Sequence, residues 1–192
     1  MRGFFRGLKI FVLGGICGTV FGVALGFFFF PYVFPPPPAN ERLTAADLAP
    51  RSAPQAPAPP ATQPPAVDPP AVQDVPKPVA TGIFIHANPS DPVHWGRGKV
   101  SAYQRVVFLE PDFEVGPGPK YHVYLVPKAN VRREADVKDS KFVDLGRLRA
   151  FKGSQRYEIP DNVDLKNYAS VVIWCEAFGV LISPADLKLA TN

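Results

Sequence analysis

Hydrophobic and polar positions divide the chain into three parts, the first of which is an apolar stretch near the N-terminus. No charged residue occurs between positions 10 and 34, and residues 10–30 make 21 consecutive uncharged positions. As a helix these residues span about 30 Å, the thickness of the apolar core of a bilayer. We therefore predict a single transmembrane helix, a signal anchor, within residues 1–34. A cleaved secretory signal is the alternative, but its apolar region is shorter and ends in small residues, whereas this stretch ends in four phenylalanines and Pro31.

The charges around this helix predict its orientation. Arg2, Arg6 and Lys9 precede it, whereas Arg42, offset by Glu41, follows it. Positive residues close to a transmembrane segment remain in the cytoplasm. We expect a cytoplasmic N-terminus and, in a bacterial cell, a C-terminal domain in the periplasm on a single-pass anchor in the inner membrane.

Glycine recurs every four residues in the same helix, at Gly14, Gly18, Gly22 and Gly26. These positions lie near one face and leave a groove in which a second backbone can approach closely. The spacing predicts a dimer through the glycines. The alternative is that glycine is simply common in membrane helices.

The second part, residues 35–79, is dominated by proline and alanine. Of the 24 prolines in the chain, 16 lie between Pro31 and Pro78. This composition includes too few large apolar residues to bury a core. We predict a disordered linker that reaches up to roughly 140 Å when fully extended.

The third part, residues 80–192, alternates short apolar runs with turn residues and contains no run of helical period. This pattern predicts an all-β domain, an antiparallel β-sandwich. The expected strands are 82–86, 99–103, 105–110, 121–126, 157–160, 170–174 and 178–182. The polar stretch 128–141 is predicted as either a long surface loop or a short exposed helix.

Alternation along the strands predicts which side chains share a face. Ile173 and Cys175 point the same way, opposite Trp174, so Cys175 is expected on an apolar face. In the strand 121–126, His122 and Tyr124 share one side and three apolar or aromatic residues share the other.

Charge and motifs exclude several classes of function. The last 113 residues carry 15 Lys and Arg against 13 Asp and Glu, without a dense basic stripe, so we expect no nucleic-acid partner. A nucleophile elbow, a phosphate loop and a dinucleotide fingerprint are all missing from the sequence, so hydrolases and nucleotide-dependent enzymes are not indicated.

Cys175 is the main candidate for chemistry. It is the only cysteine of the exported domain and has no partner for an internal disulfide, because Cys17 lies in the predicted membrane helix. A buried structural cysteine is one interpretation. The others are a redox-active thiol, a thiolate ligand to haem iron and an intermolecular disulfide, each of which needs an accessible sulfur.

The three histidines, His86, His94 and His122, lack the close pairing of a zinc site, so no metal centre is predicted. As a second ligand beside Cys175, His122 is the strongest candidate because it lies on a strand. We expect Cys175 and His122 as the cofactor-binding residues if a cofactor such as haem is bound, and the sequence equally allows none.

Several motifs together resemble the DM-thirteen family, an extracytoplasmic β-rich domain found in bacteria and beside DOMON domains in animal surface proteins. The resemblance covers 82 to about 187. The residues that carry it are Gly82-Ile83-Phe84, His94, Gly98, Val100, Gly118-Pro119, His122-Val123-Tyr124-Leu125, Asp144-Leu145-Gly146, Gly153, Gln155, Tyr157, Ile159-Pro160, Asp164-Leu165, Tyr168, Ser170-Val171-Val172-Ile173-Trp174-Cys175 and Phe178.

The resemblance implies a proposed electron-transfer role centred on Cys175, as a bare thiol or through a prosthetic group such as haem. One position departs from the family, since Lys120 stands where an acidic residue is common. Two functional hypotheses follow: a tethered redox module in which Cys175 exchanges electrons with an envelope partner, and a non-catalytic module that binds a protein or glycan of the cell envelope while Cys175 is structural.

Overall fold

The computed structural model describes residues 2–48 and 77–190. They form two units that divide between Pro37 and Pro38. The first unit holds helix α1 (Arg2–Val33), which confirms the predicted N-terminal helix. Over the described residues, no helix is both long and apolar enough to cross a membrane, so the predicted transmembrane span is not confirmed.

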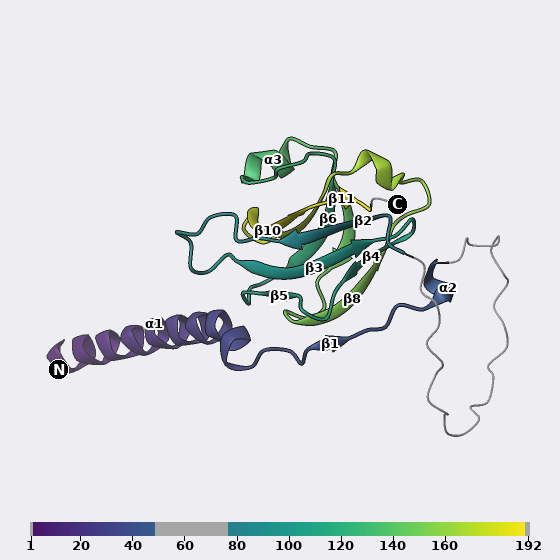
Figure 1. The fold of residues 1–192 in the computed structure, drawn as a ribbon. Coiled ribbons are helices and arrows are strands. Elements are labelled where there is room, and N and C mark those ends of the chain that lie inside the picture. The colour runs from purple at the N-terminus through teal and green to yellow at the C-terminus, as the bar shows by residue number, and fades with distance from the viewer. Residues whose placement is uncertain (1, 49–76, 191–192) are drawn as a thin grey trace, which may run out of the picture. The chain divides into compact units, whose positions relative to one another are not determined.

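The second unit is built on one sheet of 11 strands that curls around a core (Figure 1). The strands are β1 (Ala39–Asn40), β2 (Ala80–Phe84), β3 (Gly96–Ala102), β4 (Val106–Leu109), β5 (Glu114–Val115), β6 (Tyr121–Val126), β7 (Val143–Arg147), β8 (Gly153–Glu158), β9 (Ser170–Cys175), β10 (Val180–Asp186) and β11 (Lys188–Leu189). Their order across the sheet is β1-β8-β4-β3-β2-β10-β9-β6-β7, with β11 beside β2 and β5 beside β3.

The all-β prediction is confirmed, but the antiparallel sandwich is corrected to a single curled, mixed sheet. Among the described pairs, β1 and β8 run parallel and the others antiparallel. The register shifts between β6 and β7 and between β9 and β10. Such irregularities bend and twist strands, which lets one sheet wrap around its own core instead of stacking on a second sheet.

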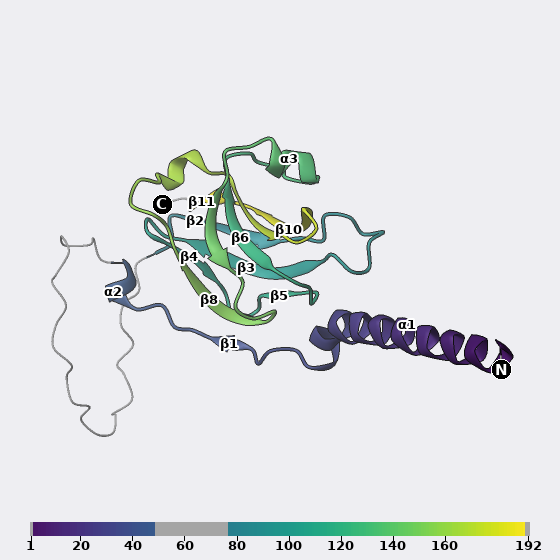
Figure 2. The same ribbon diagram turned by 180° about the vertical axis from the view of Figure 1, so that it is seen from behind.

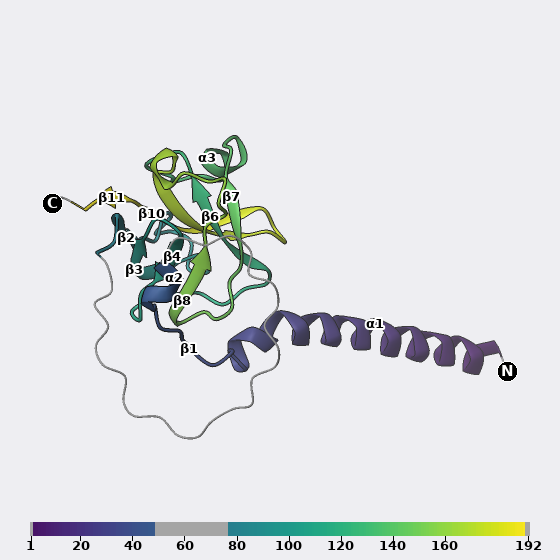
Figure 3. The ribbon, with the colours of Figure 1, turned by 90° about the vertical axis from the view of Figure 1, so that its right-hand side faces the viewer.

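The main core fills the inside of this curl, and a smaller apolar cluster lies on the outside. The inner cluster draws residues from β2, β3, β4, β6, β8, β9 and β10. The outer cluster consists of Tyr124, Val126, Val131, Val137, Val172, Trp174 and Leu181. Helix α3 (Glu134–Lys138) adjoins this outer cluster, seen at the top of the unit in Figures 1 and 3.

The stretch 128–141 therefore contains a short helix, one of its two predicted forms, but the helix is not fully exposed. Val137 is 0% and Asp136 6% exposed. The Asp136 carboxylate accepts hydrogen bonds from the Lys128 ammonium (2.6 Å) and from the backbone N–H groups of Arg132 (2.9 Å) and Arg133 (3.0 Å). These bonds offset the cost of burying a charge and lower the pKa of Asp136, with the Lys128 hydrogen bond as the largest cause.

The predicted strands match the structure well in the centre of the sheet and poorly at its margins. Strand β6 has its predicted bounds, and β9 extends the prediction by one residue to Cys175. The short strands β1, β5 and β11, together with β7, were not predicted. β7 has the sequence VDLGR, and its charged and glycine residues do not form the apolar pattern of a strand, although it pairs with β6.

Residues 49–76, which make up most of the predicted linker, lie outside the described residues. The part just before them forms β1 and helix α2 (Ala45–Leu48). β1 pairs with the edge of β8, as Figure 2 shows from behind. The remaining element is a short 3-10 helix (Leu165–Asn167). The Asp164 side chain caps its N-terminus by accepting a hydrogen bond from the Lys166 N–H.

Candidate functional site: the Cys175 thiol and the two faces of strands β6 and β9

Cys175 ends strand β9 and points into the core. It pairs with Tyr121 of β6 and Val180 of β10, and its side chain joins the inner cluster with 1% exposure. The thiol donates a hydrogen bond to the carbonyl oxygen of Pro119 at 3.3 Å. The predicted apolar face is confirmed, and the sulfur lies directly beneath the turn that leads into β6.

Two contacts between Lys120 and Glu176 connect that turn to the end of β9. The Glu176 N–H donates to the Lys120 carbonyl oxygen at 3.1 Å, and the Lys120 ammonium lies 3.0 Å from the Glu176 carboxylate. Lys120 adopts a left-handed conformation (φ 53°), which is unusual for a residue with a side chain. A Cβ at Gly118 would lie 2.1 Å from the Tyr121 hydroxyl oxygen, so the turn requires glycine there.

His122 lies on the opposite face from Cys175. It pairs with Trp174, and its Nδ1 is 2.9 Å from the Asp144 carboxylate of β7, while its Nε2 is 3.5 Å from that of Glu176. Because neighbouring residues of a strand alternate between faces, His122 and Cys175 are not brought into one site. Sequence spacing did not indicate Asp144, which reaches His122 through the pairing of β6 with β7.

The outer face around His122 is aromatic and charged. The Tyr124 ring stacks on Phe142, with centroids 4.4 Å apart, and lies 6.3 Å from the Trp174 ring. The Lys138 ammonium lies 5.7 Å from the Trp174 ring centroid. Burial raises the pKa of Tyr124 to about 12, and the negative charges of Asp144 and Glu176 add to the effect.

Comparison with known proteins identifies the family of this unit. The family model described as Electron transfer DM13 matches residues 89–187, which is 99 of the 192 residues. The chain belongs to the Electron transfer DM13 family. The matched range includes Cys175, His122, Asp144 and the turn over the thiol. No curated protein and no solved structure matches the chain.

A haem group does not fit the Cys175 site of this DM13 domain. A thiolate ligand to haem must stand at the wall of a cleft that is large enough for the macrocycle. The Cys175 sulfur is instead enclosed by the inner cluster and engaged by the Pro119 carbonyl. His122, the predicted second ligand, faces away from it.

The other two histidines belong to the loop between β2 and β3. His94 Nδ1 lies 2.6 Å from the Asp91 carboxylate, and His86 Nε2 lies 2.7 Å from the Asp91 carbonyl oxygen. The hydrogen bond with His94 is the largest of the causes that lower the pKa of Asp91 to about 2. Over the described part of the chain, no group of three or more His, Cys, Asp and Glu side chains is arranged to hold a metal ion.

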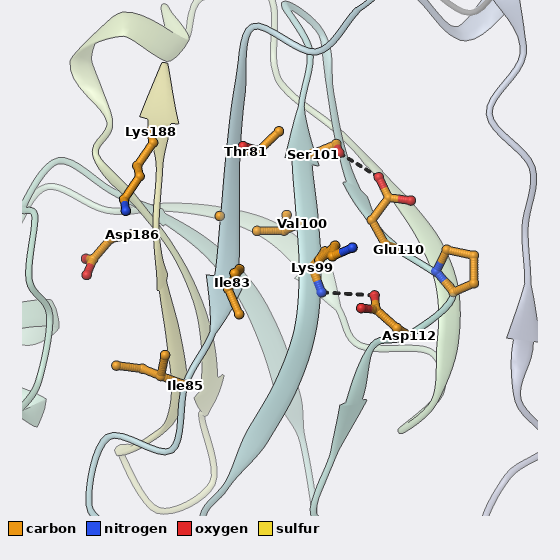
Figure 4. Close-up of a pocket in the computed structure, with 12 residues that line it drawn as sticks. Thr81, Ile83, Ile85, Lys99, Val100, Ser101, Glu110, Asp112, Asp186 and Lys188 are labelled. Carbon is orange, nitrogen blue, oxygen red and sulfur yellow. Dashed lines mark hydrogen bonds between the residues drawn. The ribbon is translucent and has the colours of Figure 1, made fainter. Parts of the chain in front are cut away.

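An open groove on β2 and β3 was not predicted from the sequence. It has a volume of about 820 Å³, and Figure 4 shows Ile83 and Lys99 along it, with Glu110 and Asp112 on one side and Asp186 and Lys188 on the other. The acidic groups on the first side are engaged within the protein: Glu110 accepts from the Ser101 hydroxyl, and Asp112 from the Lys99 N–H. The groove collects residues distant in sequence, so only the sheet order reveals it.

Proposed function

We propose that this DM13 domain transfers electrons through the thiol of Cys175, which becomes reachable when the turn above it opens. Membership of the Electron transfer DM13 family supports the type of function. The single observation that carries the assignment to Cys175 is the position of its sulfur. It lies beneath the turn that leads into β6 and is hydrogen-bonded to the Pro119 carbonyl of that turn.

The covering turn is built from contacts that open at low cost. Lys120 is 58% and Glu176 41% exposed at the side chain, and such ion pairs add at most about 1 kcal/mol. The left-handed conformation of Lys120 adds strain to the closed turn. Local opening therefore needs much less free energy than unfolding of the sheet.

The proposed chemistry is thiol–disulfide relay between a donor dithiol and an acceptor disulfide of envelope proteins. Cys175 loses its proton and attacks the acceptor disulfide, so that a mixed disulfide forms and an acceptor thiolate leaves and is protonated. One donor thiol then attacks the sulfur of Cys175, so that a mixed disulfide with the donor forms and the second acceptor sulfur leaves as a thiol. The other donor thiol attacks its partner sulfur, so that a donor disulfide forms and Cys175 leaves as a thiol. The acceptor gains two electrons and two protons, which the donor loses.

We also propose that the domain is tethered outside the cytoplasm. The support is the uncharged stretch 10–34 with positive residues before it, as well as the glycines at positions 14, 18, 22 and 26, which suit pairing of two anchors. After an alkaline wash of membranes, the full chain should remain in the pellet. Recovery in the wash would contradict the tether.

The thiol assignment is tested by the rate at which a maleimide labels Cys175 in the full chain carrying Cys17→Ser. We expect slow labelling of the native protein that is still much faster than global unfolding, and faster labelling when Lys120→Gln removes the ion pair with Glu176. The double variant Cys17→Ser and Cys175→Ser is the blank. Labelling no faster than unfolding, unchanged by Lys120→Gln, would overturn the assignment.

A second candidate is a recognition module for an envelope protein or glycan, in which Cys175 is structural. The observation in its favour is the 1% exposure of Cys175 combined with the open groove on β2 and β3. Labelling confined to the unfolded state, together with an absorption spectrum that reduction does not change, would favour this function.

A further inference from the structure

The edge of strand β8 is occupied by a segment from outside the family domain. We call residues 39–47 the clasp. Its strand β1 runs parallel to β8, with Ala39 opposite Gly153 and Asn40 opposite Ser154. The Ala39 N–H donates to the Lys152 carbonyl at 2.9 Å, and the Glu41 N–H donates to that of Ser154 at 3.1 Å. The chain thus completes its own sheet edge with residues far upstream (Figures 1 and 2).

Glu41 is the main side-chain anchor of the clasp. Arg149 donates to both of its carboxylate oxygens, from Nε at 2.8 Å and from Nη2 at 2.9 Å, and the Arg156 N–H adds a third bond at 2.9 Å. The Arg149 guanidinium is already positioned by the Tyr157 ring, whose centroid lies 4.4 Å away. Two parallel bonds to a planar guanidinium select a carboxylate at this position.

A second carboxylate follows six residues later. Asp47 forms an ion pair with the Arg156 guanidinium and also accepts hydrogen bonds from the N–H (2.8 Å) and hydroxyl (2.7 Å) of Thr44. The clasp therefore presents two acidic side chains to two arginines of the domain.

The receiving edge is also shaped by hydrogen bonds within the domain. Gln155 is fully buried, and its side-chain oxygen accepts from the N–H groups of Arg149 (3.0 Å) and Ala150 (3.1 Å) while its nitrogen donates to the Ala150 carbonyl (2.8 Å). Gly153 has φ +87°, and a Cβ there would lie 2.0 Å from the Ala39 carbonyl oxygen. The loop that carries Arg149 is thus held in place, and the backbone beside it leaves room for another strand.

The clasp is held loosely compared with the strands of the sheet. Only two of its residues pair with β8, and the side chains of Arg149 and Arg156 are 46% and 43% exposed. Cavities of about 580 and 780 Å³ adjoin Glu41 and its neighbour Arg42. Exposed ion pairs are screened by salt, so the attachment depends on ionic strength.

We propose that the β8 edge is a strand-addition site for an extended acidic peptide, and that its occupant is the clasp of the same chain, which docks and releases. The receiving residues lie within the family match 89–187, whereas the clasp lies outside it. With the clasp docked, five residues (34–38) separate α1 from the domain; with it released, the connection comprises residues 34–79. Docking thus sets the length of free chain before the domain, whether the domain transfers electrons or binds a ligand.

The test uses trypsin cleavage after Arg42 in the full chain, a bond that lies inside the clasp. Docking should protect it, and Glu41→Gln should speed cleavage roughly three- to tenfold, since it removes the bidentate ion pair but not the backbone bonds. High salt should speed cleavage of the original chain and have little effect on the variant. Glu134→Gln makes the same chemical change at an exposed position of α3 and should leave the rate unchanged.

A second measurement separates docking from general stability. A labelled peptide with the sequence of residues 38–48 should bind the Glu41→Gln chain at low salt, and the same chain with Arg149→Gln added should not bind it. Glu41 lies outside the core, so its substitution leaves the domain folded. Equal cleavage rates for the original chain and Glu41→Gln, with no binding of the peptide, would overturn the proposal.

Discussion

The two faces of strands β6 and β9 are both buried, but by different means. On the inner face, Val123, Ile173 and Cys175 are at most 1% exposed and packed within the closed curl of the sheet. On the outer face, Trp174 and Tyr124 lie in the outer cluster with Val131 and Val137 of the stretch 128–141, and the Lys138 ammonium and the Phe142 ring lie against them. A group on the inner face is therefore reached only when the sheet itself opens, whereas the outer face is covered by a loop and a short helix that lie outside the sheet.

This difference places different chemistry on each face. In the proposed function, the thiol inside the curl is shielded from solvent oxidants and reacts when its turn opens, as a gated redox group would. The His122 imidazole on the outer face lies between two carboxylates, and its side chain is 16% exposed. The adjacent positions 174 and 175 thus belong to unlike environments.

The largest effect is expected from truncation inside the curl. Ile173→Ala should lower the free energy of unfolding by about 2–5 kcal/mol, because it leaves a cavity that the closed core cannot fill. Phe142→Ala on the outer face, where the ring is 39% exposed, should cost about 1 kcal/mol. Urea unfolding of both variants measures the difference. Equal losses would show that the two faces are packed alike.

A smaller loss of stability is expected at low pH, where the Asp136 carboxylate, which holds helix α3 and the stretch before it, becomes protonated. The folded-state pKa of Asp136 lies below its ordinary value, so its stabilising effect is complete above about pH 4 and is lost as the pH falls toward the folded-state pKa. Asp91, with a pKa of about 2, acts in the same direction. Asp136→Asn should therefore flatten the decline in stability between about pH 4 and pH 2. An unchanged slope would contradict the role of Asp136.

The pKa values of two tyrosines, one on each face, allow a further comparison. Tyr124 on the outer face and Tyr157 in the inner core both have a pKa of about 12, mainly through burial. Because these values exceed the unfolded pKa near 10, stability is complete below about pH 10 and falls as the pH rises toward 12. Asp144→Asn should lower the pKa of Tyr124 toward its ordinary value and leave that of Tyr157 unchanged. The absorbance of tyrosinate reports both; parallel shifts would contradict the assignment.

The smallest change in stability is expected at the turn over Cys175. Lys120→Gly relieves the left-handed conformation but removes an exposed ion pair and makes the unfolded chain more flexible, so the net change should stay within about 1 kcal/mol. The rate at which a maleimide labels Cys175 should nevertheless change, because the substitution alters the turn above the thiol. A large loss of stability would show that the turn is part of the core.

Much of the centre of the sheet could be predicted from the sequence. The apolar and aromatic run 121–126 indicated β6, and alternation along the apolar run that ends at Cys175 indicated the face of that cysteine. A central strand is covered on both faces, and its side chains reflect that burial. Two of the family motifs, residues 122–125 and 170–175, lie in the same strands, so the family was also recognisable from the residues.

The candidate site was only partly predictable. Cys175 stood out as the one cysteine of the domain, but its partner atom, the Pro119 carbonyl, is a backbone group without a sequence signature. Asp144 and Gln155 belong to the family motifs, yet their contacts depend on β7 and β8, whose polar and glycine residues do not show a strand pattern.

Local sequence therefore determined the secondary structure of the central strands and the face of each of their side chains, because these follow from apolar runs and the alternation of neighbouring residues. It also determined the family, through motifs of adjacent residues. Only the tertiary structure decided that the sheet curls into one layer, that His122 and Cys175 are separated, and that Glu41 meets Arg149 across 108 positions of the chain. Those outcomes depend on strand order and register, which are set by contacts between distant segments and have no local pattern.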